Sequence, residues 1–125
     1  MIFHHIGIAC KDISKELQKL KKIHSIVDQS EIIYDELQNV NLCMITIHGG
    51  FKMELVSGKT VETLVTKGTT NYHLCFECDD INSEIERLVS NGALLVSPAK
   101  PAILFGGKLV AFLLVSYGLI ELLQK

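Results

Sequence analysis

The chain contains two copies of one pattern, and this internal repeat limits its possible folds more than any other feature. Residues 5–13 read HIGIACKDI and residues 73–81 read HLCFECDDI, so a histidine, a cysteine, an aspartate and an isoleucine recur at one constant offset. Residues 53–57 (MELVS) and 120–124 (IELLQ) also correspond, each with a glutamate followed by a leucine. Each half therefore begins with a strand that carries a histidine and ends with a strand that carries a glutamate.

The segments between these anchors correspond as well. Apolar residues at helical spacing follow Asp12 and again follow Asp80, and each aspartate is placed to cap the helix it precedes. Each helix is followed by three strand candidates. These lie at 31–37, 40–48 and 51–57 in the first half, and at 93–97, 108–115 and 118–124 in the second. Each half is thus predicted to be a βαβββ module, which makes the fold class α+β.

The length of 125 residues and a hydrophobic content of 48% fit one domain with a substantial core. We assign residues 1–125 to a single domain, with module 1 at 1–58, a connecting segment with a short helix at 59–70, and module 2 at 71–125. Residues 98–107 (PAKPAILFGG) are predicted to be irregular, because prolines and a glycine pair oppose regular structure. Such a loop is either a lid over a site or an ordinary exposed connection.

Charge and composition exclude several classes of function. The net charge is −2 and the basic residues are scattered, which favours neither nucleic acid nor a membrane surface as a partner. The most apolar run, at 109–123, is shorter than the roughly 20 residues of a membrane span. No secretory signal is visible at the start of the sequence. We therefore expect a soluble, cytoplasmic protein.

Four cysteines occur in strand-like runs: Cys10, Cys43, Cys75 and Cys78. The last two have the C-x-x-C spacing of redox and zinc motifs. On a strand, however, residues three apart point to opposite faces, so these two thiols cannot share a ligand. We predict that all four are buried apolar side chains.

Side-chain alternation indicates which residues share a face. On the strand around His73, the larger apolar residues lie on the opposite face, where the helix would pack. If the first and last strands of each half pair, His5 lies near Glu54, and His73 lies near Glu121. Two half-sheets facing each other would bring all four side chains together.

Two imidazoles and two carboxylates suit a divalent ion such as nickel, cobalt, manganese, iron or zinc. Octahedral coordination would leave two positions for water or substrate, unlike the closed shell of a structural zinc. A single histidine on a strand is more often structural, but the recurrence in both halves favours a metal site. His4 competes with His5 for the inward position, and the alignment with His73 selects His5. His24 and His48 are expected to be exposed.

These motifs resemble the vicinal oxygen chelate superfamily, which includes glyoxalase I, methylmalonyl-CoA epimerase, extradiol dioxygenases and antibiotic-resistance proteins. The resemblance covers nearly the whole chain and is closest to the glyoxalase I and epimerase branch. It implies a cupped mixed sheet of two βαβββ modules, the glyoxalase/bleomycin resistance/dioxygenase fold, usually in a homodimer. The family's metal ligands fall on His5, Glu54, His73 and Glu121.

The resemblance implies a divalent-metal-dependent isomerase or lyase that removes a proton next to a carbonyl. It would be glyoxalase I (lactoylglutathione lyase)-like or methylmalonyl-CoA epimerase-like, with a thioester, a hemithioacetal or a related carbonyl compound as substrate. Either Glu54 or Glu121 would be the catalytic base. Glu77 shares the face of His73 and could assist, although a surface role is the simpler interpretation.

Two departures weigh against a CoA substrate. The turn before the last strand is shorter than in similar epimerases, and Arg87 is the only arginine, although Lys52, Lys100 and Lys108 could contact phosphates as point charges. Two alternatives remain open. One is a non-catalytic small-molecule binding or resistance protein of the same fold. The other is an iron-dependent ring-cleaving dioxygenase, against which the second carboxylate argues.

Overall fold

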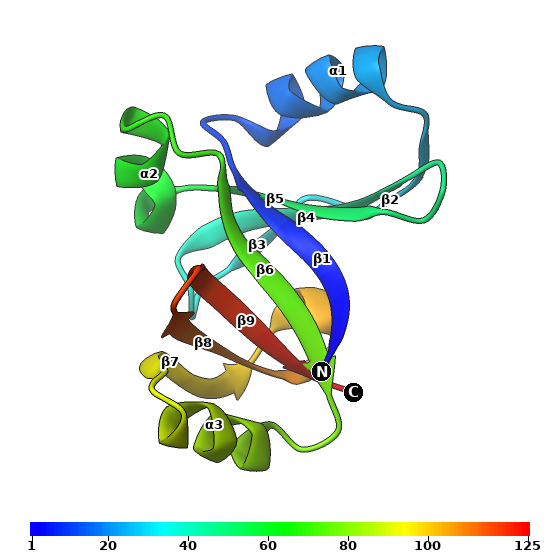
Figure 1. Cartoon of the computed structure of the whole chain (residues 1–125). Helices are drawn as coiled ribbons and strands as arrows, with labels where there is room; N and C mark the ends of the chain where they lie inside the picture. The colour runs from blue at the N-terminus through cyan, green and yellow to red at the C-terminus, as the bar shows by residue number, and fades with distance from the viewer. The chain divides into compact units, whose positions relative to one another are not determined.

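A computed structural model describes all residues from 1 to 125 and divides them into two compact units (Figure 1). The N-terminal unit comprises His5–Tyr72. The C-terminal unit comprises His73–Lys125 together with Met1–His4, which lie at the start of the first strand. Each unit contains strands and helices of its own, and each is described separately.

The N-terminal unit is built around four main strands. Its elements are β1 (Ile2–Ala9), α1 (Ile13–Ile23), β2 (Ile26–Gln29), β3 (Ile33–Asp35), β4 (Val40–Ile47), β5 (Lys52–Ser57), a 3-10 turn (Lys59–Val61) and α2 (Glu62–Thr66). The strand order is β2-β4-β5-β1, with β3 also on β4. The strand β1 pairs with β5 in parallel, whereas β4 is antiparallel to its neighbours.

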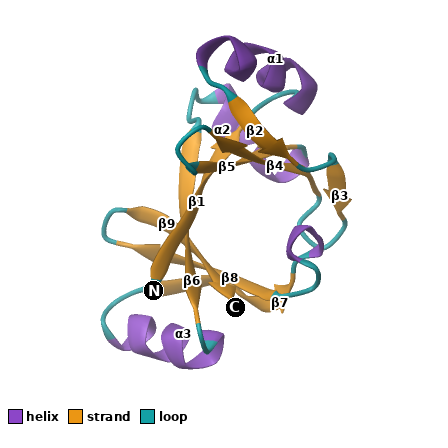
Figure 2. Cartoon of the chain, turned by 90° about the vertical axis from the view of Figure 1, so that its right-hand side faces the viewer, coloured by secondary structure: helices purple, strands orange, loops and turns teal.

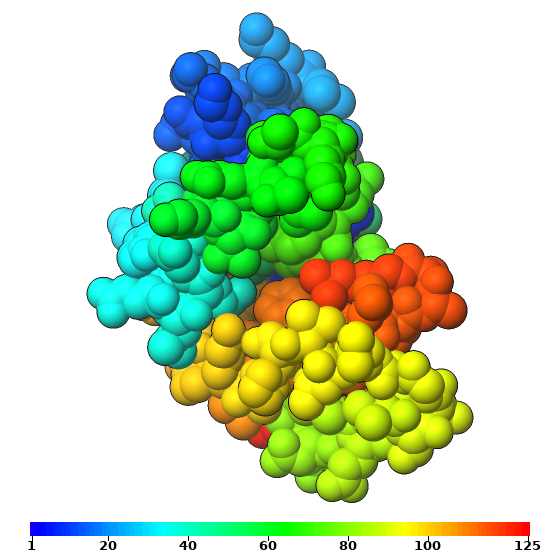
Figure 3. Space-filling model, turned by 90° about the vertical axis from the view of Figure 1, so that its left-hand side faces the viewer, coloured from blue at the N-terminus to red at the C-terminus, as the bar shows by residue number.

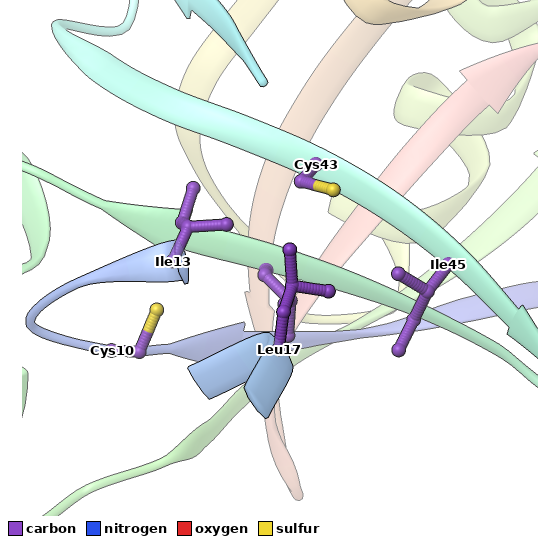
Figure 4. Close-up of a cluster of buried hydrophobic side chains, with 6 residues drawn as sticks. Cys10, Ile13, Leu17, Cys43 and Ile45 are labelled. Carbon is purple, nitrogen blue, oxygen red and sulfur yellow. The ribbon is translucent and has the colours of Figure 1, made fainter. Parts of the chain in front are cut away.

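Helix α1 packs on one face of these strands. It begins where expected, because the Asp12 side chain accepts a hydrogen bond from the backbone N–H of Lys15 at 3.1 Å. Figure 4 shows Ile13 and Leu17 of the helix beside Cys43 and Ile45 of β4. Burial of each such side chain stabilises the fold by about 1.5–3 kcal/mol.

The C-terminal unit repeats this plan with fewer strands. Its elements are β6 (Asn71–Cys78), α3 (Ile81–Ser90), β7 (Leu94–Pro101), a 3-10 turn (Ile103–Phe105), β8 (Leu109–Val115) and β9 (Gly118–Gln124). The strand order is β6-β9-β8-β7, and β6 pairs with β9 in parallel, as β1 does with β5. Figure 2 shows α3 along the outside of these strands. No helix in the structure is both long and apolar enough to cross a membrane.

The predicted strand at 31–37 is confirmed as a shorter strand, β3, and the sequence did not predict β2 before it. The chain between the two strands is held by Ser30. The backbone N–H of Ser30 donates to the carbonyl of Met44, and its hydroxyl accepts from the N–H of Met44 at 2.9 Å. This local hydroxyl bond stands between the pairing of β2 with β4 and the pairing of β3 with β4.

The prediction of an irregular segment at 98–107 is also wrong in its first part. Residues up to Pro101 belong to β7, with register shifts between Leu95 and Lys100. Strand β7 lies at the edge of the sheet, where a proline lacking N–H costs no ladder hydrogen bond. The remaining turn is packed rather than open, since Ala102 is 1% exposed and Phe105 contacts the cluster around Cys75.

The bend after β5 requires a glycine. Gly58 has a φ of 122°, and a Cβ there would lie 3.2 Å from both the Asn39 carbonyl oxygen and the Val40 Cα. We expect Gly58→Ala to lower the free energy of unfolding by about 2–4 kcal/mol, because backbone strain and steric contact add. Gly118→Ala is the matched control, since its φ is 127° and nothing lies within 4 Å.

Denaturant unfolding of the two glycine variants measures this difference. The control variant should lose only the part of the free energy of unfolding that comes from backbone strain, about 1–3 kcal/mol. Equal losses in both variants would show that the close approach to the Asn39–Val40 backbone contributes nothing.

Candidate functional site

In the N-terminal unit, a buried histidine lies beside a buried glutamate. Strand β1 runs parallel to β5 with Gly7 opposite Glu54, and His5, two residues before Gly7, projects from the same face. The His5 Nε2 and Glu54 Oε1 atoms are 3.7 Å apart. The two residues are 0% and 4% exposed.

The C-terminal unit builds an equivalent pair by the same register. Cys75 lies opposite Glu121 in the parallel pairing of β6 with β9, and His73 again precedes that position by two residues. The His73 Nε2 and Glu121 Oε1 atoms are 3.4 Å apart, and the residues are 3% and 1% exposed. Both halves of the sequence repeat thus produce one imidazole–carboxylate pair on the face away from the helix.

The distance in the C-terminal pair is compatible with two ligands of one metal ion, and the distance in the N-terminal pair is slightly longer than such ligands require. Both N···O distances exceed the 2.7–3.2 Å of an ordinary hydrogen bond. Two ligands that are each about 2.1 Å from an ion lie roughly 3.0–3.4 Å apart at neighbouring coordination positions. Buried carboxylates such as Glu54 and Glu121 also need a compensating positive charge. A divalent cation or a protonated histidine could supply it.

Phe112 adjoins the C-terminal pair and was not predicted from the sequence. Its ring meets that of His73 edge to face, with centroids 5.5 Å apart, and the residue lies opposite Glu121 in the pairing of β8 with β9. The hairpin register of the last two strands would have identified it, because directly opposed residues share a face.

The predicted lysine contacts fall in three different settings. Lys52 is half-buried and lies two residues before Glu54 on β5, so the two side chains share a face. Lys100 lies opposite Val110, on the face of the His73–Glu121 pair. Lys108 is exposed, just before β8. Glu77 is half-buried on β6, opposite Leu123.

The remaining histidines lie outside the two pairs. His4 is half-buried, and its ring meets that of Phe105 edge to face at 5.8 Å. His48 is exposed in the turn after β4, as predicted. His24 is half-buried at the C-terminal cap of α1, so the prediction that it is exposed is wrong. Its position follows from the cap, where its N–H donates to the Leu20 carbonyl.

The cysteines are buried, as predicted, and none of them forms a disulfide. Cys75 and Cys78 belong to separate apolar clusters, which agrees with their projection from opposite faces. Burial raises the pKa of Cys10 to about 11, with smaller contributions from the nearby Glu16 and Asp12, and burial also raises the pKa of Cys43 and Cys78. These three thiols stay protonated near neutral pH and are therefore poor metal ligands there.

Comparison with known proteins identifies the superfamily to which this fold belongs. Residues 4–112 match the model of the glyoxalase/bleomycin resistance protein/dioxygenase superfamily. The chain therefore belongs to this superfamily, also called the vicinal oxygen chelate superfamily, and it has the α+β fold with two βαβββ modules that the repeat predicts. A search of curated protein sequences found no significant match.

Solved structures with this fold include methylmalonyl-CoA epimerases. The epimerase from Mycobacterium tuberculosis superposes with a TM-score of 0.82 at 18% identity, covering 98% of this chain and 86% of the epimerase. A second methylmalonyl-CoA epimerase gives 0.69 at 18% identity, covering 99% and 94% of the two chains. A hypothetical protein from Bacillus halodurans C-125 gives 0.74 at 22% identity, covering 98% and 93%. At such identities the similarity defines the fold and leaves the activity open.

Proposed function

We propose that His5, Glu54, His73 and Glu121 together bind one divalent metal ion, and that the protein uses it to move a proton next to a carbonyl group. The observation that carries this proposal is the repeated His–Glu pair, buried in both units and built by the same strand register. A purely structural role would not require the same pair twice. The fold alone does not decide function, so the proposal rests on these side chains.

The donor atoms fit a catalytic rather than a structural metal. Imidazole nitrogens and carboxylate oxygens suit nickel, cobalt, manganese, iron or zinc, whereas structural zinc sites are usually closed by thiolates. A bound divalent ion would polarise a carbonyl oxygen and stabilise the negative charge that develops when the neighbouring proton leaves.

The chain itself would supply the base. Glu54 and Glu121 are the buried carboxylates of the site, and one of them would accept the proton at its Oε atom. Returning the proton to the opposite face of the same carbon is epimerisation, and delivering it to the adjacent carbon is the glyoxalase I reaction.

The proposed substrate is a small thioester or hemithioacetal. The methylmalonyl-CoA epimerases among the structural neighbours favour a CoA thioester. Anionic groups of the substrate would contact Lys52, Lys100 or Lys108, of which Lys100 shares the face of the His73–Glu121 pair. We also expect a homodimer, as the family resemblance implies, which light scattering would test.

Proton exchange measured by NMR tests the proposed reaction type, whichever product is formed. Metal-loaded protein is mixed in heavy water with methylmalonyl-CoA or with the hemithioacetal of methylglyoxal and glutathione. The C–H signal next to the carbonyl should disappear about 10²–10⁴-fold faster than without protein, and a chelator should abolish the effect. Tight binding of either compound without exchange would contradict catalysis and favour a binding protein of the same fold.

A further inference from the structure

The C-terminal unit presents apolar side chains on the same face as the His73–Glu121 pair. Leu113 of β8 packs in the core with α3, so Phe112 and Leu114 project from the opposite face. The hairpin register gives the same answer, because Phe112 lies opposite Glu121. Three leucines extend this apolar face from Phe112 across β8, β9 and β7.

Leu114 lies opposite Leu119 on β9 and opposite Leu94 on β7. Phe112, Leu114, Leu119 and Leu94 therefore form one continuous apolar strip across three strands. It begins at the ring of Phe112 against His73 and extends away from Glu121. From strand spacings of about 3.4 Å per residue and 4.8 Å between strands, Glu121 and Leu94 are separated by roughly 12 Å.

The far end of the strip is open to solvent. Leu114 is 46% exposed and Leu94 is 63% exposed, whereas the metal-ligand candidates beside Phe112 are buried. In Figure 3 the start of β7 (yellow) lies beside the turn between β8 and β9 (orange-red). An exposed apolar patch that leads to a buried polar pair is typical of a small-molecule site.

We propose that the apolar strip binds an unbranched alkyl substituent of the substrate, attached to the carbon next to the reacting carbonyl. The proposal rests on the proposed function, since the strip can bind this substituent only when the reacting carbonyl is bound at His73 and Glu121. Lys100 lies on the same face beside Val110, on the other side of Phe112 from Leu114. The face thus separates a charged end from an apolar end. It would orient a substrate with an anionic group at one side and a hydrocarbon chain at the other.

Alkyl hydroxamates test this assignment by binding rather than by turnover. Their chelating head would bind the metal, and their tails increase from acetohydroxamate through butyro- and hexano- to octanohydroxamate. Calorimetry on metal-loaded protein should find affinity rising about two- to fourfold for each added methylene. The reason is that moving one methylene out of water contributes at most about 0.8 kcal/mol of binding free energy. Leu114→Asn and Leu94→Asn should flatten this rise and leave acetohydroxamate affinity unchanged.

Val89→Asn is the matched control. Val89 is 45% exposed, close to the value for Leu114, but it lies on α3 and outside the strip. It should retain the full dependence on chain length. The strip proposal is overturned if acetohydroxamate binds but affinity does not rise with chain length, or if the rise survives both leucine substitutions. If affinity does not rise with chain length in the unmodified protein, and Leu114→Asn changes the molecular mass in solution, the proposal is overturned and the strip is assigned to contact with a second copy of the chain. Failure of acetohydroxamate to bind would overturn the metal site itself, and the strip proposal with it.

Discussion

Elemental analysis of the purified protein should find about one divalent ion per chain, and the His5→Ala/His73→Ala variant should hold none. The reason is that the change removes the imidazole from both buried pairs, whose N···O distances of 3.7 and 3.4 Å are longer than those of ordinary hydrogen bonds. Metal binding should also stabilise the folded protein. At a free ion concentration 100 times the dissociation constant, the gain is about 2.7 kcal/mol, visible as a rise in melting temperature.

The control for this experiment removes two other histidines. His24→Ala/His48→Ala changes the same number of imidazoles at positions outside the pairs and should keep the ion. If neither the unmodified protein nor metal-reconstituted protein holds an ion, the pairs are structural contacts. In that case the double variant should lose about 3–5 kcal/mol of stability for each broken pair, with no effect of a chelator on the unmodified protein.

Glu121→Gln should abolish the proposed reaction while leaving the fold intact. Glutamine has nearly the same shape as glutamate, but its amide cannot accept a proton, so a base role would cost about 10²–10⁴-fold in rate. Glu121 is 1% exposed, and its position on β9 is fixed by the pairing with Cys75. Because the residue is also a candidate ligand, the rate should be measured at saturating metal, with metal content determined on the same sample.

Glu77→Gln supplies the comparison for this variant. Glu77 lies on the same face of β6 as His73 but further along the strand, opposite Leu123. It should retain nearly full activity. Glu54→Gln identifies the base: if Glu121 is the base, the Glu54 variant loses metal affinity more than it loses rate at saturating metal. Full activity of Glu121→Gln would remove this residue from the mechanism and leave Glu54 as the candidate.

The repeat predicted the fold well because the signals in each half are local. Aspartate caps, helical spacing and alternating strands depend on nearby residues. The structure has the expected helices at Asp12 and Asp80, and in each half the first strand pairs with the last. The error at residues 98–107 concerns a strand at the edge of the sheet. Pro98 and Pro101 oppose a central strand, yet β7 lies at an edge, and edge position is a property of the whole sheet rather than of the segment.

The candidate ligands could be predicted for a related reason. The alternation of side chains fixes which face His73 and Glu121 occupy, and the repeat indicates which histidine to choose at positions 4 and 5. Phe112 and the apolar strip were missed, because they depend on the exact register of the hairpin between β8 and β9. A shift of one residue in that register would place Leu113, rather than Phe112 or Leu114, on the face of the pair.

Alternation along β9 also determines how this protein can vary in evolution. Ile120 and Leu122 fill the core beneath α3, and Glu121 between them faces the other way. Inserting or deleting one residue within this strand would turn the carboxylate into the core and expose both apolar side chains. We therefore expect relatives to differ in these strands by substitution at constant length. Changes in length should be confined to the turns, such as residues 48–50 between β4 and β5, where added residues leave the strand faces unchanged.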